Sequence, residues 1–144
     1  MHSNSILAPA AVLILWSLIV GFWLAFTRFP AFAKAGIKIR EAARGARYAD
    51  VENKMPPKVN WVSHNYTHLM EQPTLFYAVV AVLALDGDSS AVNLTCAWAY
   101  VAIRIAHSLW QGLVNVVYIR FVLFLLSTVF LCVLAINAVR VTLF

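Results

Sequence analysis

The chain has 144 residues, of which 62% are hydrophobic and only 12% are charged. Soluble domains carry about a quarter charged residues, and disordered chains combine low hydrophobicity with high charge, so this composition excludes both classes. The length leaves room for one domain, covering residues 1–144. The two cysteines, Cys96 and Cys132, lie in apolar runs without metal-type spacing, which indicates packing. We therefore expect a single all-α domain in a membrane.

The apolar residues form four segments, each with about the 20 residues that a helix needs to cross the hydrocarbon core. They predict spans at about residues 5–27, 61–85, 90–118 and 121–142. The first segment lacks the basic opening of a signal peptide, so we expect it to be retained. Glu71 and Arg104 are the only charged residues inside the two middle spans. The sequence therefore predicts an integral-membrane four-helix bundle.

The basic residues predict the orientation of the bundle. Eight of the eleven Lys and Arg residues lie between the first two spans, in a loop of about residues 28–60, and Arg120 lies between the last two. By the positive-inside rule both connections face the cytoplasm, so both termini lie outside it. A basic loop beside a membrane indicates topology and anionic lipid headgroups, and we expect no nucleic-acid partner. The composition of residues 33–48 favours an interfacial helix or a lid.

Polar side chains form one stripe on each of the two middle helices. At 100° per residue the stripes contain His64, His68 and Glu71 on one helix, and Arg104, His107, Ser108, Gln111 and Asn115 on the other. An ionisable group at membrane depth costs several kcal/mol unless it is paired or solvated. These stripes are therefore either polar contacts between helices or parts of a site.

The short turn at residues 86–89 makes the two middle helices antiparallel, so depth can be counted from it. Three pairs then match in depth: Glu71 with Arg104, His68 with His107, and His64 with Gln111. We expect Glu71 and Arg104 to form an ion pair. The facing histidines also leave open a haem or transition-metal protein, and a non-catalytic scaffold is a further alternative.

Two segments carry a family resemblance. Residues 64–77 (HNYTHLMEQPTLFY) resemble the second-helix motif of the MAPEG family, the membrane-associated proteins in eicosanoid and glutathione metabolism. In its bacterial branch that motif is similar to Asn-Phe-x-Asn-Leu-x-Glu-x-Pro-x-Leu-Phe-Tyr. Residues 97–108 (AWAYVAIRIAHS), together with Asn115 and Arg120-Phe121, resemble the third helix of the same branch and the beginning of its fourth.

The resemblance implies a homotrimer that holds glutathione between neighbouring subunits near the cytoplasmic side. It implies a glutathione-dependent transferase or peroxidase-like enzyme that acts on lipophilic electrophiles, here in a bacterial inner membrane. Such a protein would have the lipid bilayer and a lipophilic small molecule as its other partners.

The resemblance also implies roles for single residues. Arg120 would be the catalytic arginine that favours the thiolate, Glu71 would bind the amino group of glutathione, and Arg28 would meet one of its carboxylates. Asn65 and Arg104 would add polar contacts. His64 and His68 stand where well-studied glutathione-using members have Arg and Asn, and His107 and Gln111 stand where they have tyrosines. We include His68, His107 and Gln111 in the expected binding site.

Overall fold

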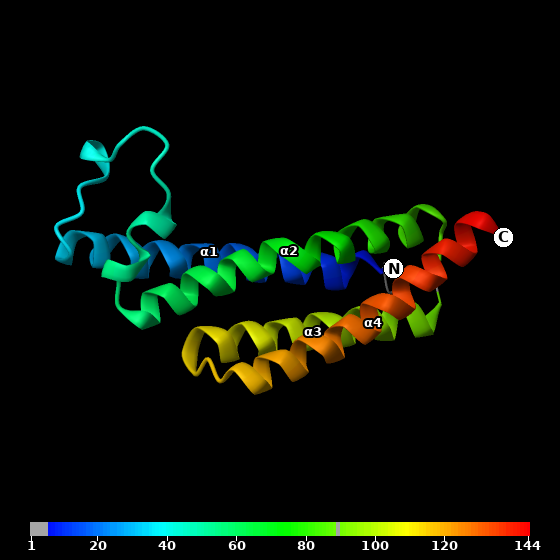
Figure 1. Ribbon diagram of the computed structural model, residues 1–144. Coiled ribbons are helices and arrows are strands. Elements are labelled where there is room, and N and C mark those ends of the chain that lie inside the picture. The colour runs from blue at the N-terminus through cyan, green and yellow to red at the C-terminus, as the bar shows by residue number, and fades with distance from the viewer. Residues whose placement is uncertain (1–5, 89) are drawn as a thin grey trace.

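The computed structural model describes residues 6–88 and 90–144, and in these ranges the chain is helical without strands. Four long helices follow one another, α1 (Leu7–Lys34), α2 (Pro57–Leu85), α3 (Ala91–Leu113) and α4 (Val117–Leu143). Figure 1 shows α1 and α2 side by side, with the α3–α4 hairpin packed along them. The predicted all-α class is confirmed.

Three of the four helices, α1, α2 and α4, are long and apolar enough to cross a membrane by length and composition. The fourth, α3, has 23 residues and carries Arg104, His107 and Gln111 among its buried side chains. These polar groups lower the hydropathy of α3, and the other three helices all pack against it. The rest of the bundle therefore shields the buried polar side chains of α3 from lipid.

The helices differ from the predicted spans mainly at the loop end. α1 continues to Lys34 instead of ending near residue 27, and α2 begins at Pro57 instead of near residue 61. A proline suits the first turn of a helix because its φ is already helical and its missing N–H would be unpaired there. α3 stops at Leu113, earlier than the predicted residue 118. Residue 5 of the first predicted span lies outside the described residues.

The expected interfacial helix at residues 33–48 is not present. That segment contains the end of α1 and one 3₁₀ turn, η1 (Ile39–Glu41). The turn η2 (Tyr48–Asp50) begins at its last residue, and η3 (Glu52–Lys54) follows. Gly36 and Gly45 have φ angles of 68° and 81°, which an α-helix does not allow. The loop instead packs Tyr48 and Met55 near the ends of α1 and α2, where Figure 1 shows it at one end of the molecule.

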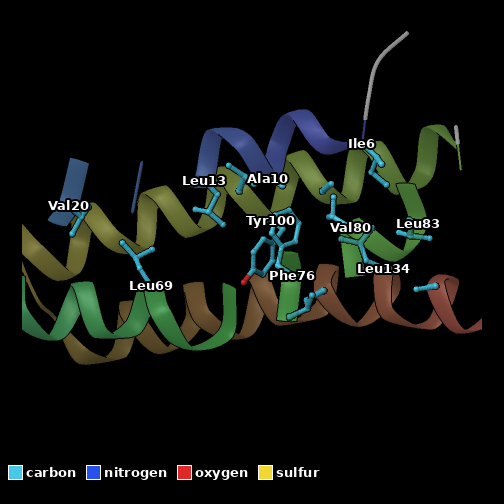
Figure 2. Packing of buried hydrophobic residues seen from close by; sticks show 14 residues of the cluster. Ile6, Ala10, Leu13, Val20, Leu69, Phe76, Val80, Leu83, Tyr100 and Leu134 are labelled. Carbon is cyan, nitrogen blue, oxygen red and sulfur yellow. The ribbon is translucent and has the colours of Figure 1, made fainter. Parts of the chain in front are cut away.

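An apolar core joins all four long helices. Figure 2 shows Leu13 of α1, Phe76 of α2, Tyr100 of α3 and Leu134 of α4 among its members. The Phe76 and Tyr100 rings stack with centroids 4.4 Å apart. Between helices in lipid the hydrophobic effect is weak, so close contact of such side chains supplies the stability.

One contact between α1 and α3 depends on a glycine. A Cβ atom built on Gly112 would lie 2.5 Å from the Trp23 ring, whereas one on Gly21 would lie 3.2 Å from the Tyr66 ring. Real Cβ atoms essentially never come within 2.5 Å of another heavy atom in this way, so the indole would have to move. The absence of a side chain at residue 112 therefore sets the spacing of these two helices.

We predict that Gly112→Ala lowers the free energy of unfolding by about 1–3 kcal/mol, because overpacking displaces Trp23. Thermal unfolding in detergent, followed by circular dichroism, measures the effect. Gly21→Ala is the control and should change the melting temperature less, since its contact is looser and alanine favours the helix. Equal melting temperatures for Gly112→Ala and the wild type would contradict the prediction.

Candidate functional site

A cavity of about 290 Å³ lies between α2, α3 and the start of α4. Its lining combines two histidines and one arginine with apolar side chains: His68, His107, Arg120, Val117, Phe121 and Phe124. The rings of His68 and His107 lie 5.3 Å apart between centroids, and Phe124 meets His68 edge-on at 5.7 Å. The predicted match in depth between His68 and His107 is confirmed.

The arginine of this cavity is held by the connection between α3 and α4. Nη1 of Arg120 donates a hydrogen bond of 2.6 Å to Oδ1 of Asn115. Asn115 has a φ of 58°, in the left-handed region that asparagine tolerates better than most residues. Because Asn115 both turns the chain and binds the guanidinium, the position of Arg120 is set by a segment of only a few residues.

A buried polar cluster, consisting of Asn65, Arg104, Ser108 and Gln111, lies on α2 and α3 with at most 1% exposure for each residue. Nη2 of Arg104 donates a hydrogen bond of 2.8 Å to the backbone carbonyl of His68. This bond connects the cluster directly to the backbone that carries one of the cavity histidines. Asn65 and Gln111 have side-chain nitrogen and oxygen atoms that are buried without a hydrogen-bond partner among the described residues.

The predicted ion pair between Glu71 and Arg104 is wrong. The Glu71 side chain is 61% exposed, and its carboxylate lies 3.9 Å from Nδ1 of His68, while Arg104 binds the helix backbone. The reason is rotational: the two residues share a depth, but Glu71 lies on the outward face of α2. The sequence therefore predicted the depth of Glu71 correctly but not the side of α2 toward which its carboxylate points.

The predicted match in depth between His64 and Gln111 does not bring the two side chains together. His64 is exposed at the loop end of α2, and its Nε2 lies 2.6 Å from Oε1 of Glu52 in the loop. Gln111 is buried within α3. His64 therefore connects α2 to the loop and lies outside the polar cluster.

Arg28 does not line the histidine cavity. Its guanidinium donates a hydrogen bond to the Ser63 hydroxyl and lies 4.0 Å from the centre of the Tyr48 ring. The Tyr48 hydroxyl in turn donates to Oδ1 of Asn60 at 2.6 Å. Burial raises the pKa of Tyr48 above its ordinary value, and the nearby Arg28 partly opposes that shift. Tyr48 thus stays neutral as it joins the loop to both α1 and α2.

Arg28 instead lines a second cavity of about 500 Å³ along α1. Apolar side chains make most of this wall, among them Leu18, Phe22, Phe29 and Phe32, with Tyr66 of α2. A cation at one point of an apolar groove suits a ligand that has an acidic group and a lipophilic part.

The predicted site residues thus fall into four places. His68, His107 and Arg120 share the cavity; Asn65, Arg104 and Gln111 belong to the adjoining buried cluster; Glu71 and Arg28 lie outside both. The apolar wall from α4 was missed, although Phe121 and Phe124 are three residues apart directly after Arg120. Within residues 6–88 and 90–144, no three His, Cys, Asp or Glu side chains group as metal ligands.

A sequence model of the MAPEG family matches residues 6–140, which is nearly the whole chain. The chain belongs to the MAPEG family. Neither the curated proteins nor the solved structures gave a match. The predicted family is confirmed, as is the membrane helical bundle, whereas its bacterial branch stays a prediction. This MAPEG protein is embedded in a membrane, and its outer side chains contact lipid.

We predict that Asn115→Ala lowers the free energy of unfolding by about 1–3 kcal/mol, because it combines a strained left-handed residue with loss of the Arg120 bond. Asn115→Gly removes the bond without the strain and should lose less. Thermal melts of the three proteins in one detergent compare them. Identical losses for Ala and Gly would show that the backbone conformation contributes nothing.

Proposed function

We propose that the protein is a membrane enzyme that uses glutathione, as a transferase or in a peroxidase-like reaction, on lipophilic electrophiles. The observation that carries this proposal is the cavity in which the anchored Arg120 faces two imidazoles and an aromatic wall. A nearby guanidinium favours the thiolate form of a thiol, which is the nucleophile. Phe121 and Phe124 offer an apolar surface to the electrophile.

The membrane supports this chemistry physically. Lipophilic electrophiles concentrate in the bilayer, whereas glutathione is charged and comes from water. A cavity at a helix interface lets the two meet in a fixed geometry, which is the basis of proximity catalysis. We take the basic loop of residues 28–60 to face the cytoplasm of a bacterial inner membrane, with both termini on the other side, so glutathione would enter from the loop end.

The outer face of α2 supports assembly into a homotrimer. Five of its exposed residues are small or polar and recur at spacings of three and four: Thr67, Glu71, Thr74, Ala78 and Ala81. The exposed apolar Met70, Leu75 and Val82 lie beside this stripe. By contrast the exposed faces of α1 and α4 carry bulky apolar side chains such as Phe22, Leu125 and Ile136. Small residues at this spacing allow close helix packing in membranes, whereas bulky apolar residues suit lipid. We therefore assign the α2 stripe to contacts between copies.

Glu71 would connect the proposed trimer interface with glutathione binding. It is the central residue of α2, so an exposed carboxylate there would face hydrocarbon unless a second copy or a ligand covers it. The ammonium group of glutathione bound between two copies would satisfy the carboxylate. Arg28, at the cytoplasmic third of α1, would bind a glutathione carboxylate, and Asn65, Arg104 and Gln111 would hold the floor of the site.

We predict that glutathione raises the melting temperature of the purified protein in detergent, since a ligand that binds only the folded state stabilises it, by about 2.7 kcal/mol at 100 times Kd. Arg120→Gln and Glu71→Gln should each reduce the shift. Arg140→Gln, which removes the other arginine of α4 at its far end, is the matched control. An unshifted wild-type melt at millimolar glutathione would contradict binding.

Turnover separates this proposal from its alternatives. Purified protein should conjugate glutathione to an activated aryl halide, and a complete lack of turnover with several classes of electrophile would contradict the enzyme. A scaffold would show altered stability in Glu71→Gln without any ligand-binding defect. An absorbance spectrum with a haem band, or stoichiometric metal by elemental analysis, would favour the cofactor protein instead.

We predict that a cysteine on the α2 stripe crosslinks between copies. In a background carrying Cys96→Ala and Cys132→Ala, Ala78→Cys should form covalent dimers when membranes are oxidised, because the stripes of neighbouring copies meet. Leu125→Cys on the outer face of α4 is the control and should stay monomeric. Denaturing gel electrophoresis without reductant reads the result. Equal crosslinking at both positions would remove the α2 stripe as the interface.

A further inference from the structure

We propose that His68 is the general base that takes the proton from the thiol of glutathione, and that His107 positions it. This inference rests on the proposed function and adds the group that generates the nucleophile. It is drawn from the lining of the histidine cavity and from the contacts of the two rings.

The lining leaves few groups that can accept a proton. Val117, Phe121 and Phe124 have no basic atom, and Arg120 carries a guanidinium that stays protonated in proteins. The two imidazoles remain. An ordinary imidazole has a pKa of about 6.5, so it is mostly neutral near pH 7, whereas a free thiol with a pKa of about 8.5 is mostly protonated there. A proton acceptor in the cavity would therefore increase the fraction of glutathione that is present as thiolate.

Charge distinguishes His68 from His107 as the acceptor. The carboxylate of Glu71 on α2 lies 3.9 Å from Nδ1 of His68, where it stabilises a positive ring. Arg104 on α3 and Arg120 on α4 act against a positive charge on either ring. His107 is 2% exposed and has no carboxylate beside it among the described residues, while the His68 side chain is 28% exposed. His68 is thus the more accessible ring for a ligand, and its protonated form is stabilised by the Glu71 carboxylate.

His107 and Phe124 hold the His68 ring in place. The His107 ring lies beside it at 5.3 Å and Phe124 meets it edge-on, so rotation about the side-chain bonds of His68 is restricted. The Arg104 bond to the His68 carbonyl fixes the backbone beneath. Arg120, held by Asn115, is then placed to attract the thiolate as it forms.

The reaction balances with these groups alone. The thiol proton moves to a nitrogen of His68, and the thiolate attacks the ring carbon that bears the halogen of an aryl halide. A carbon–sulfur bond forms and the carbon–halogen bond breaks, so the halide leaves with the bonding electron pair. The imidazolium then releases its proton to water. The products are a thioether, a halide ion and a proton.

The pH dependence of kcat/KM for aryl halide conjugation tests the assignment. In the wild type, kcat/KM should rise as the imidazole becomes neutral and level off by about pH 7.5. His68→Gln should lose about 100-fold at about pH 7, within the range of general-base effects, and recover toward the wild type above about pH 9, where the thiol ionises without help. His107→Gln should lose less. His64→Gln, on the same helix but bonded to Glu52, should keep the wild-type profile.

S-methylglutathione, which has no thiol proton, serves as the binding probe. A thermal shift with this probe shows that His68→Gln folds and binds. His68→Asn, with the residue that other family members carry there, replaces a variant that fails to fold. An unchanged pH profile in a folded, binding His68 variant overturns the general base and leaves the proposed function standing. A wild type without conjugation at any pH overturns both.

Discussion

The hydrogen bond from Arg104 of α3 to the carbonyl of His68 joins the buried polar side chains of this bundle to the histidine cavity. A guanidinium without exposure inside a membrane protein is costly, and it requires an acceptor at its own depth. That acceptor is a backbone carbonyl, whereas Glu71 faces outward. Nε and Nη1 of Arg104 are buried without a hydrogen-bond partner among the described residues. The same bond fixes the turn of α2 that carries His68 opposite His107. Arg104 thus connects the buried polar cluster with the histidine cavity.

The apolar core and the polar cavity lie toward opposite ends of the helix bundle. Toward the turn between α2 and α3, Phe76, Val80, Leu83 and Leu134 form a dense apolar core (Figure 2). Toward the loop, the interior becomes polar and the cavity opens beside Arg120. Apolar packing in one half can hold the helices together while the other half keeps polar groups incompletely bonded. A site for a polar cosubstrate in a membrane needs such unsatisfied groups.

The sequence predicted the helices well because length and hydropathy are enough to recognise apolar segments of this size. It also predicted the depth of His68 and His107, since a short turn and a rise of about 1.5 Å per residue define depth on paired helices. It failed on rotation: a shared face for His64 and Glu71 does not reveal which neighbour that face meets. The loop was missed for a different reason, because the positive φ of Gly36 is not visible in its helix-forming neighbours. Asn115 gave no signal of its left-handed conformation either.

The contacts of Arg28 would couple the loop to ligand binding in the proposed function. Its guanidinium is bonded to Ser63 and stacked on Tyr48, which itself binds Asn60. An acidic ligand that recruits this guanidinium competes with the contact that holds the loop to the bundle. By thermodynamic reciprocity, binding then loosens the loop by as much free energy as the loop withholds from binding. Under the proposed function, substitutions in the basic loop that weaken these contacts would therefore raise the affinity for an acidic ligand.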